Sequence, residues 1–357
     1  MFSIIKNFVI FLILLFFVYL IVSLIIKHRL IQKKLDEENS EDLQEGFTFT
    51  SQSGELKSLE VKDGSLVMAN IAPKNSKLPL REYFMKASYN TALTGSYINT
   101  DMVKYVLSRG CRFLDFEVYS IDNIPYVSYS TDPAFSTQTE NTVLLSDVLT
   151  TISQSGFMAP SPNPTDPLFI QFRIKTTISE LYSQIAMSLS KNLGSRLYKG
   201  EVNGSTILSD LLGKIIIIVD KSTSPDYYKY SNCNSANKTY DLKKYVNMES
   251  GGNNLRIFKY SQLMNQQTTP IYINDDGITT TSSTMKLVVP DIAYNIAGIS
   301  RNPSPIQLIT DYGVQIVAYR FYQVDSNLQA YEKIFSDNKS AFIPMAQLLN
   351  YINTEPE

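Results

Sequence analysis

Residues 100–119 read TDMVKYVLSRGCRFLDFEVY, and this stretch decides the fold class. Its first part, Thr100–Leu107, has the apolar spacing of an amphipathic helix. After Gly110, the run Arg112–Tyr119 is strand-like and is apolar on both faces. A strand buried on both faces and preceded by a helix is typical of the parallel sheets of α/β proteins.

The same alternation continues along the chain. Further strand-like runs are predicted at Pro125–Tyr129, Pro167–Ile174, Lys214–Asp220 and Val314–Phe321, and further helices at Leu144–Gln154, Ser179–Leu193 and Leu328–Phe335. Buried strands that alternate with crossover helices indicate a parallel sheet. The length of residues 77–357 fits a (β/α)8 barrel of the TIM type.

Composition excludes several classes of function. Hydrophobic residues make up 44% of the chain and charged residues 18%, which is ordinary for a folded core, and the net charge of −2 gives no basic face for nucleic acid. Its two cysteines, Cys111 and Cys233, imply no disulfide framework. The single histidine, His28, precedes the predicted barrel, which therefore has no histidine base, acid or metal ligand.

The N-terminal region predicts a membrane anchor. Residues 8–26 contain no charge, and a helix of that length spans about 28 Å, close to the thickness of a bilayer's hydrocarbon core. Basic residues follow at Lys27, Arg29, Lys33 and Lys34, so the positive-inside rule places the body on the cytoplasmic side. We expect residues 1–34 to form this anchor with its basic flank, and residues 35–76 a stalk or small β extension. Abundant Tyr, Ile, Asn and Lys with no Trp prompt the hypothesis of an AT-rich large DNA virus, whose inner membrane would then hold the protein.

Several motifs occur in the order and spacing of one enzyme family. The segments PLREYF (79–84), ASYNTALTG (87–95), RGCRFLDFE (109–117), IPYVSY (124–129) and DPLFIQFR (166–173) are similar to successive motifs of the X region of phosphatidylinositol-specific phospholipase C. Fainter matches at 304–305, 311–318 and 338–344 resemble the family's Y region. The resemblance implies an X-like half at 77–221, a polar linker at 222–254 and a Y-like half at 255–357.

The resemblance also implies where the chemistry would stand. In the family, two histidines act as base and acid, and a calcium ion is held by an asparagine and acidic residues. The histidine positions carry Tyr89 and Tyr129 here, and a phenol with a pKa near 10 is a poor base at neutral pH. Asn90, Asp115 and Glu117 stand at three of the four calcium-ligand positions, and Arg173 replaces the fourth. The two lysines of the family's headgroup contact are replaced by Ile218 and Asp220.

These replacements predict an ion-pair cluster of Arg173 with Asp115 and Glu117, and no tight calcium site, because the guanidinium supplies much of the charge that the metal would supply. Asn90 and Arg173 are the candidate phosphate contacts. We expect no cofactor, and calcium only if the protein is active.

Three functional hypotheses follow. The first is a membrane-tethered pseudoenzyme whose barrel binds a lipid headgroup, such as a phosphoinositide, or a protein neighbour. The second is an active, calcium-independent phosphodiesterase of the phospholipase C type, which requires an open, phosphate-sized pocket at the barrel mouth. The third is a purely structural membrane protein, for instance of a virion.

Overall fold

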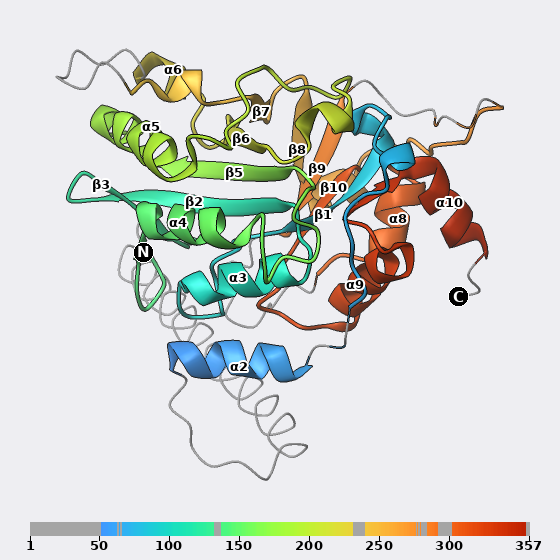
Figure 1. Ribbon diagram of the computed structural model, residues 1–357, viewed down its shortest axis with the longest axis horizontal. Coiled ribbons are helices and arrows are strands. Elements are labelled where there is room, and N and C mark those ends of the chain that lie inside the picture. The colour runs from blue at the N-terminus through green and yellow to red at the C-terminus, as the bar shows by residue number, and fades with distance from the viewer. Residues whose placement is uncertain are drawn as a thin grey trace, which may run out of the picture. The chain divides into compact units, whose positions relative to one another are not determined.

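The computed structural model describes residues 51–62, 64, 66–131, 137–230, 240–275, 277, 279, 284–291 and 302–354. Eight parallel strands close into a TIM-type barrel, because β1 pairs with both β10 and β2 (Figure 1). In spatial order, the barrel strands are β1 (Tyr83–Ser88), β2 (Phe113–Ile121), β5 (Leu168–Lys175), β6 (Ile215–Asp220), β7 (Met248–Ser250), β8 (Leu255–Lys259), β9 (Met285–Val289) and β10 (Ile316–Tyr319). The predicted (β/α)8 barrel is confirmed.

Three short strands extend the sheet beyond the barrel. They are β3 (Ile124–Ser128) and β4 (Val143–Leu144), which continue antiparallel from β2, and β11 (Phe342–Pro344), which pairs antiparallel with the start of β1. The hairpin of β2 and β3 reaches past the barrel and carries the chain toward Tyr129.

Helices cover the outside of the barrel. The longer ones are α3 (Thr100–Ser108), α4 (Leu145–Ser155), α5 (Ser179–Leu193), α9 (Ser326–Asn338) and α10 (Met345–Thr354). Shorter helices are α6 (Tyr227–Tyr230), α7 (Tyr260–Met264) and α8 (Pro305–Thr310), with 3-10 turns at Pro73–Asn75, Leu80–Glu82, Leu208–Leu211 and Leu242–Lys244. In Figure 1, α4 and α5 run along β2 and β5, while α8, α9 and α10 lie beside β10 and β1.

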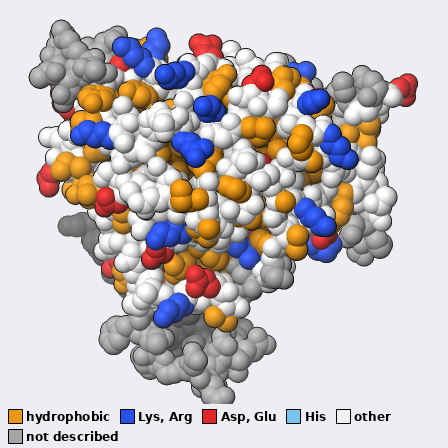
Figure 2. Space-filling view, viewed as in Figure 1, with side chains coloured by type: hydrophobic (Ala, Val, Ile, Leu, Met, Phe, Trp, Pro, Cys, Tyr) orange, Lys and Arg blue, Asp and Glu red, His pale blue; other side chains and the backbone are white. Residues whose placement is uncertain are grey.

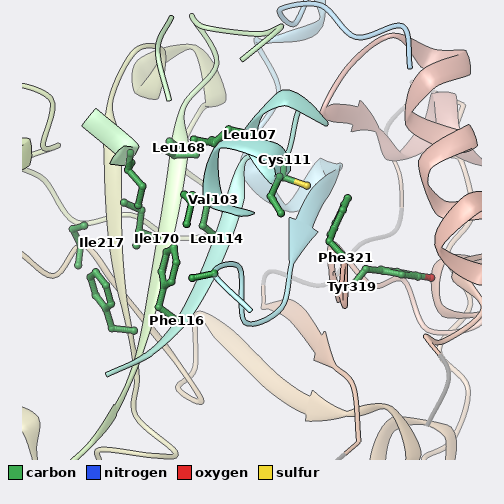
Figure 3. Close-up of a cluster of buried hydrophobic side chains, with 14 of the residues drawn as sticks. Val103, Leu107, Cys111, Leu114, Phe116, Leu168, Ile170, Ile217, Tyr319 and Phe321 are labelled. Carbon is green, nitrogen blue, oxygen red and sulfur yellow. The ribbon is translucent and has the colours of Figure 1, made fainter. Parts of the chain in front are cut away.

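Strict alternation along the strands creates two hydrophobic cores. On β1, Met85 and Ala87 face the barrel interior, where they join side chains such as Phe113 and Phe169. The opposite faces of the strands pack against the helices. Figure 3 shows part of this second core, in which Leu114, Phe116, Leu168, Ile170 and Ile217 lie near Val103 and Leu107 of α3.

An eleven-residue helix, α2 (Gln52–Lys62), precedes the barrel. It buries Leu56 and Leu59 in the outer core. The Glu55 carboxylate accepts hydrogen bonds from Thr94 Oγ1 (2.6 Å) and Ser96 N (3.1 Å), in the loop that follows β1. This corrects in part the expected stalk or small β extension at residues 35–76, because residues 52–62 form a helix. Leu59 packs on the barrel from this helix, while Val61 is 85% exposed, so β propensity does not decide the local structure.

The predicted polar linker at 222–254 is also corrected, because the barrel strand β7 lies within it. A three-residue strand that reads Met-Glu-Ser gives no hydrophobic period to recognise. The predicted membrane span at 8–26 and its flank lie outside the described residues. Among the residues described, no helix combines the length and the hydrophobicity that crossing a membrane requires.

Candidate functional site

The sequence-predicted site residues gather at the carboxyl ends of neighbouring barrel strands. Tyr89 and Asn90 follow β1, Asp115 and Glu117 lie on β2, and Arg173 lies on β5. In a TIM barrel this end carries the active site, because its loops are free to vary while the strands hold their residues in place. Register places Glu117 beside Arg173 across the β2–β5 pair.

Asn90 turns the chain sharply at the end of β1. Its φ of 46° lies in the left-handed region, which asparagine tolerates better than most residues. The turn lets Asn90 N donate to Asp115 Oδ2 (3.1 Å), while Thr91 N donates to the Asp115 carbonyl (2.8 Å). The turn therefore holds the Asp115 carboxylate against β1.

Arg173 is the centre of the cluster. Its Nε donates to Asp115 Oδ1 at 2.9 Å and its Nη2 to Asp115 Oδ2 at 2.7 Å, a bidentate pair. Its Nη1 donates to Glu117 Oε1, and its Nη2 also to Asn90 Oδ1. The predicted ion-pair cluster is thus confirmed. Burial by itself lowers the pKa of Arg173, but the carboxylates of Asp115 and Glu117 outweigh it and raise that pKa well above its usual value.

The carboxyl oxygens that remain are also engaged. Glu117 Oε2 accepts from the Tyr119 hydroxyl (2.5 Å) and from Ser130 N (3.2 Å). Asp115 Oδ1 accepts a second bond from Gln171 Nε2 (3.0 Å). Every oxygen of the two carboxylates therefore has a donor from the protein itself.

Calcium does not fit this arrangement. The ion needs six to eight oxygens with free lone pairs directed at one point. Here the guanidinium lies between the two carboxylates, and its Nη2 also holds the side-chain oxygen of Asn90. In the described part of the chain, no group of three or more His, Cys, Asp and Glu residues could hold a metal. Asn90, Asp115 and Glu117 lie together, but they are arranged around a cation that the chain supplies.

Tyr89 lies directly on Arg173. The guanidinium carbon is 4.5 Å from the centre of the Tyr89 ring, and Arg173 Nη1 donates to the Tyr89 hydroxyl at 3.2 Å. Tyr89 is only 1% exposed. Burial raises its pKa well above the usual value, and Arg173 opposes this only in part.

Tyr129 lies in the same neighbourhood but is half-buried. Burial and the charge of Glu117 raise its pKa, while Arg320 and Arg173 lower it. Both phenols therefore stay protonated at neutral pH, where they donate hydrogen bonds and do not act as bases.

Three residues of the site were missed by the sequence analysis. Gln171 and Tyr119 orient the two carboxylates, as described above. Lys259 ends β8, where Leu255 and Ile257 face the barrel interior, so alternation directs Lys259 toward the mouth. Burial lowers the pKa of Lys259 to about 8, and Arg173 adds to this effect. The alternating pattern of residues 255–259 was the signal that could have placed it.

The comparisons with known proteins agree with this geometry. Residues 76–221 match the X domain of phosphatidylinositol-specific phospholipase C. That segment contains all six predicted site residues, so the resemblance to the X region is confirmed. No curated protein sequence gives a significant match to the chain.

Solved structures give the fold. The crystal structure of L. pealei PLC21 superposes with a TM-score of 0.55 at 17% identity, over 85% of this chain and 43% of that one. The structure of S. officinalis PLC21 gives 0.53 at 17% identity, over 85% and 42%. The chain thus spans less than half the length of these two proteins. The membrane anchor, the side of the membrane, the viral source and the roles of the X-domain residues remain predictions.

Proposed function

We propose that this protein binds a phosphorylated lipid headgroup at the mouth of its phospholipase C-like barrel and does not hydrolyse it. The observation that carries the proposal is the engaged Arg173 cluster. Its guanidinium forms ion pairs with both Asp115 and Glu117, and the two histidine positions hold phenols of raised pKa. General acid and base groups each contribute about 10² to 10⁴ to rate, so little turnover is expected without them.

The closed state of the cluster argues against the active alternative. Arg173 is 5% exposed, Tyr89 1% and Glu117 2%, so the groups that would have to meet a scissile phosphate are covered by their neighbours. A purely structural role differs from ours only in binding no headgroup, and the binding measurements below separate the two.

Turnover of phosphatidylinositol tests the catalytic half of the proposal. The full-length chain would be assayed in mixed detergent micelles, with and without calcium, beside the variant Y89H/Y129H/R173E. We expect no turnover by the wild type and a calcium-dependent gain in the variant, which restores both titrating groups and the fourth calcium ligand, an acidic one. Wild-type turnover that is abolished by Y89F would contradict the proposal. Near-ultraviolet circular dichroism would confirm that the variant keeps its tertiary structure.

We also propose that residues 8–26 tether the barrel to a membrane, with the body on the cytoplasmic side, because that run is long and free of charge. The full-length chain should remain in the membrane pellet after alkaline extraction, while a chain that starts at residue 35 should be released. Release of the full-length chain would overturn the anchor.

A further inference from the structure

The barrel mouth has more hydrogen-bond donors than acceptors. Both carboxylates of the Arg173 cluster are fully engaged, as are the oxygens of Asp220, which accept from Ser222 N and Oγ and from Thr223 Oγ1. Two donors at the mouth have no acceptor. Asn90 Nδ2 is buried without a partner, and the Tyr129 hydroxyl makes no hydrogen bond to a described residue. A surplus of donors suits an oxyanion and not a metal cation.

Lys259 adds a positive charge to the mouth, where Asp115, Glu117 and Asp220 attract it only from a distance. Among the described residues, its ammonium makes no ion pair and no hydrogen bond. It is half-buried, so it loses part of its hydration without gaining a partner. Buried charges are usually paired, because an unpaired charge loses its hydration without compensation. A group in this state favours an anionic ligand that supplies the missing partner.

We propose that Lys259 binds the phosphoryl group of the ligand, a phosphomonoester or phosphodiester, together with the hydroxyl of Tyr129. This inference rests on the proposed function and names the residue that performs it. Both side chains are within electrostatic reach of Arg173 and Glu117, and both are accessible, whereas Arg173 is covered. The anion therefore contacts Lys259 and Tyr129 directly, and the Arg173 cluster forms the floor beneath it. One acceptor, Gln171 Oε1, is also buried without a partner and can receive a water or a ligand hydroxyl.

The dependence of binding on pH gives a specific readout. The charged groups that act on Lys259 are Arg173 on β5, Asp115 and Glu117 on β2, and Asp220 on β6. The second ionisation of a phosphomonoester has a pKa near 6, so the ligand is largely dianionic from pH 7 upward. The Lys259 ammonium should lose its proton between about pH 7 and 9.5, so affinity should fall across that interval.

Calorimetric titration of the full-length chain in a nonionic detergent tests the proposal. Three ligands separate the possible sources of the phosphoryl group: inorganic phosphate, myo-inositol 1-phosphate, and phosphatidylinositol in mixed micelles. At pH 7 we expect Lys259→Met to weaken binding about tenfold or more, the range for a lost hydrogen bond to a charged group. Lys259→Arg should keep the affinity and should abolish its decline between about pH 7 and 9.5, since arginine does not titrate there.

Lys221→Met is the matched control. It removes the same charge near the same end of the barrel, but Lys221 is paired with Glu249 at 3.0 Å. The control should bind within about twofold of the wild type. If Lys259→Met binds as the control does, Lys259 is not the ligand contact, although the proposed function stands. If the wild type binds none of the three ligands, both proposals fail. If Lys259→Met does not fold, the pH profile of Lys259→Arg decides: a decline equal to the wild type's would overturn the role of Lys259.

Discussion

Arg173 holds both carboxyl oxygens of Asp115, with Nε 2.9 Å from Oδ1 and Nη2 2.7 Å from Oδ2. Asp115 is fully buried and Arg173 is 5% exposed, so water cannot solvate either charge if its partner is removed. The two charges of this pair therefore depend on each other for compensation. Removing one partner of such a pair leaves an uncompensated buried charge, whereas removing all the charges together is far milder.

Arg173→Met should therefore lower the free energy of unfolding by about 3–5 kcal/mol at neutral pH. The loss should shrink as the pH falls, because protonation neutralises the buried carboxylates that the variant leaves without a cationic partner. Urea denaturation followed by circular dichroism measures both effects. The triple variant R173M/D115N/E117Q, which has no charge left in the cluster, should recover most of the loss; equal destabilisation of the two variants would show that the ion pairs are not its cause.

Calcium should stabilise an altered protein and not the native one. In Arg173→Glu, the three oxygen-bearing residues Asn90, Asp115 and Glu117 gain a fourth oxygen-bearing neighbour, which is acidic, and lose the guanidinium. We expect calcium to raise the thermal midpoint of this variant. At a calcium concentration one hundred times the dissociation constant, the free energy of unfolding should rise by about 2.7 kcal/mol. The wild type and Arg173→Gln should not respond. A calcium-dependent shift in the wild type would mean that Arg173 leaves the carboxylates when the metal binds.

Some of this site could be predicted from sequence and some could not. The strands β6 and β10 are nearly continuous apolar runs, and β2 and β5 are mainly apolar, so all four could be recognised as buried strands. Asp115, Glu117 and Arg173 are among the few polar residues within β2 and β5. The strands β7 and β8 are only three and five residues long and include polar residues. Their place in the barrel follows from closure of the sheet, which is a property of the whole chain, and Lys259 was missed with them.

The charged side chains on the surface give less information about the binding site than the buried ones. On the face shown in Figure 2, Lys and Arg side chains are interspersed with Asp and Glu, so no large area of one charge marks a binding site. The informative charges are the buried ones, and burial depends on tertiary packing. The motif positions of the family resemblance predicted that Arg173 lies beside two carboxylates. The hydrogen-bond donor to each carboxyl oxygen could be identified only in the folded structure.

Alkaline pH should destabilise the protein through its buried phenols. Burial raises the pKa of Tyr89 and Tyr119 above the value near 10 that they have in the unfolded chain. The folded state then keeps protons that the unfolded state releases, so stability is complete below about pH 10 and declines above it, by up to about 1.4 kcal/mol per pH unit for each phenol. Urea midpoints at successive pH values measure the slope. Tyr89→Phe should make it shallower, while Tyr272→Phe, at a 64% exposed position, should not; equal slopes would remove Tyr89 as a cause.

Glu55 should hold the loop that leads from β1 into the site. Its carboxylate accepts from Thr94 Oγ1 at 2.6 Å and from Ser96 N at 3.1 Å, and it connects α2 to the segment that follows Tyr89 and Asn90. Glu55→Ala removes the acceptor for both donors. We expect the free energy of unfolding to fall by about 1.5–3 kcal/mol, the range for hydrogen bonds to a charged group. Hydrogen exchange should become faster at the amide of Ser96, while the amides of β5 should stay protected. Glu60→Ala, at an exposed position on the same helix, should change neither the free energy of unfolding nor the exchange rate of the Ser96 amide. If Glu60→Ala speeds that exchange equally, the effect belongs to α2 as a whole and not to the Glu55 carboxylate.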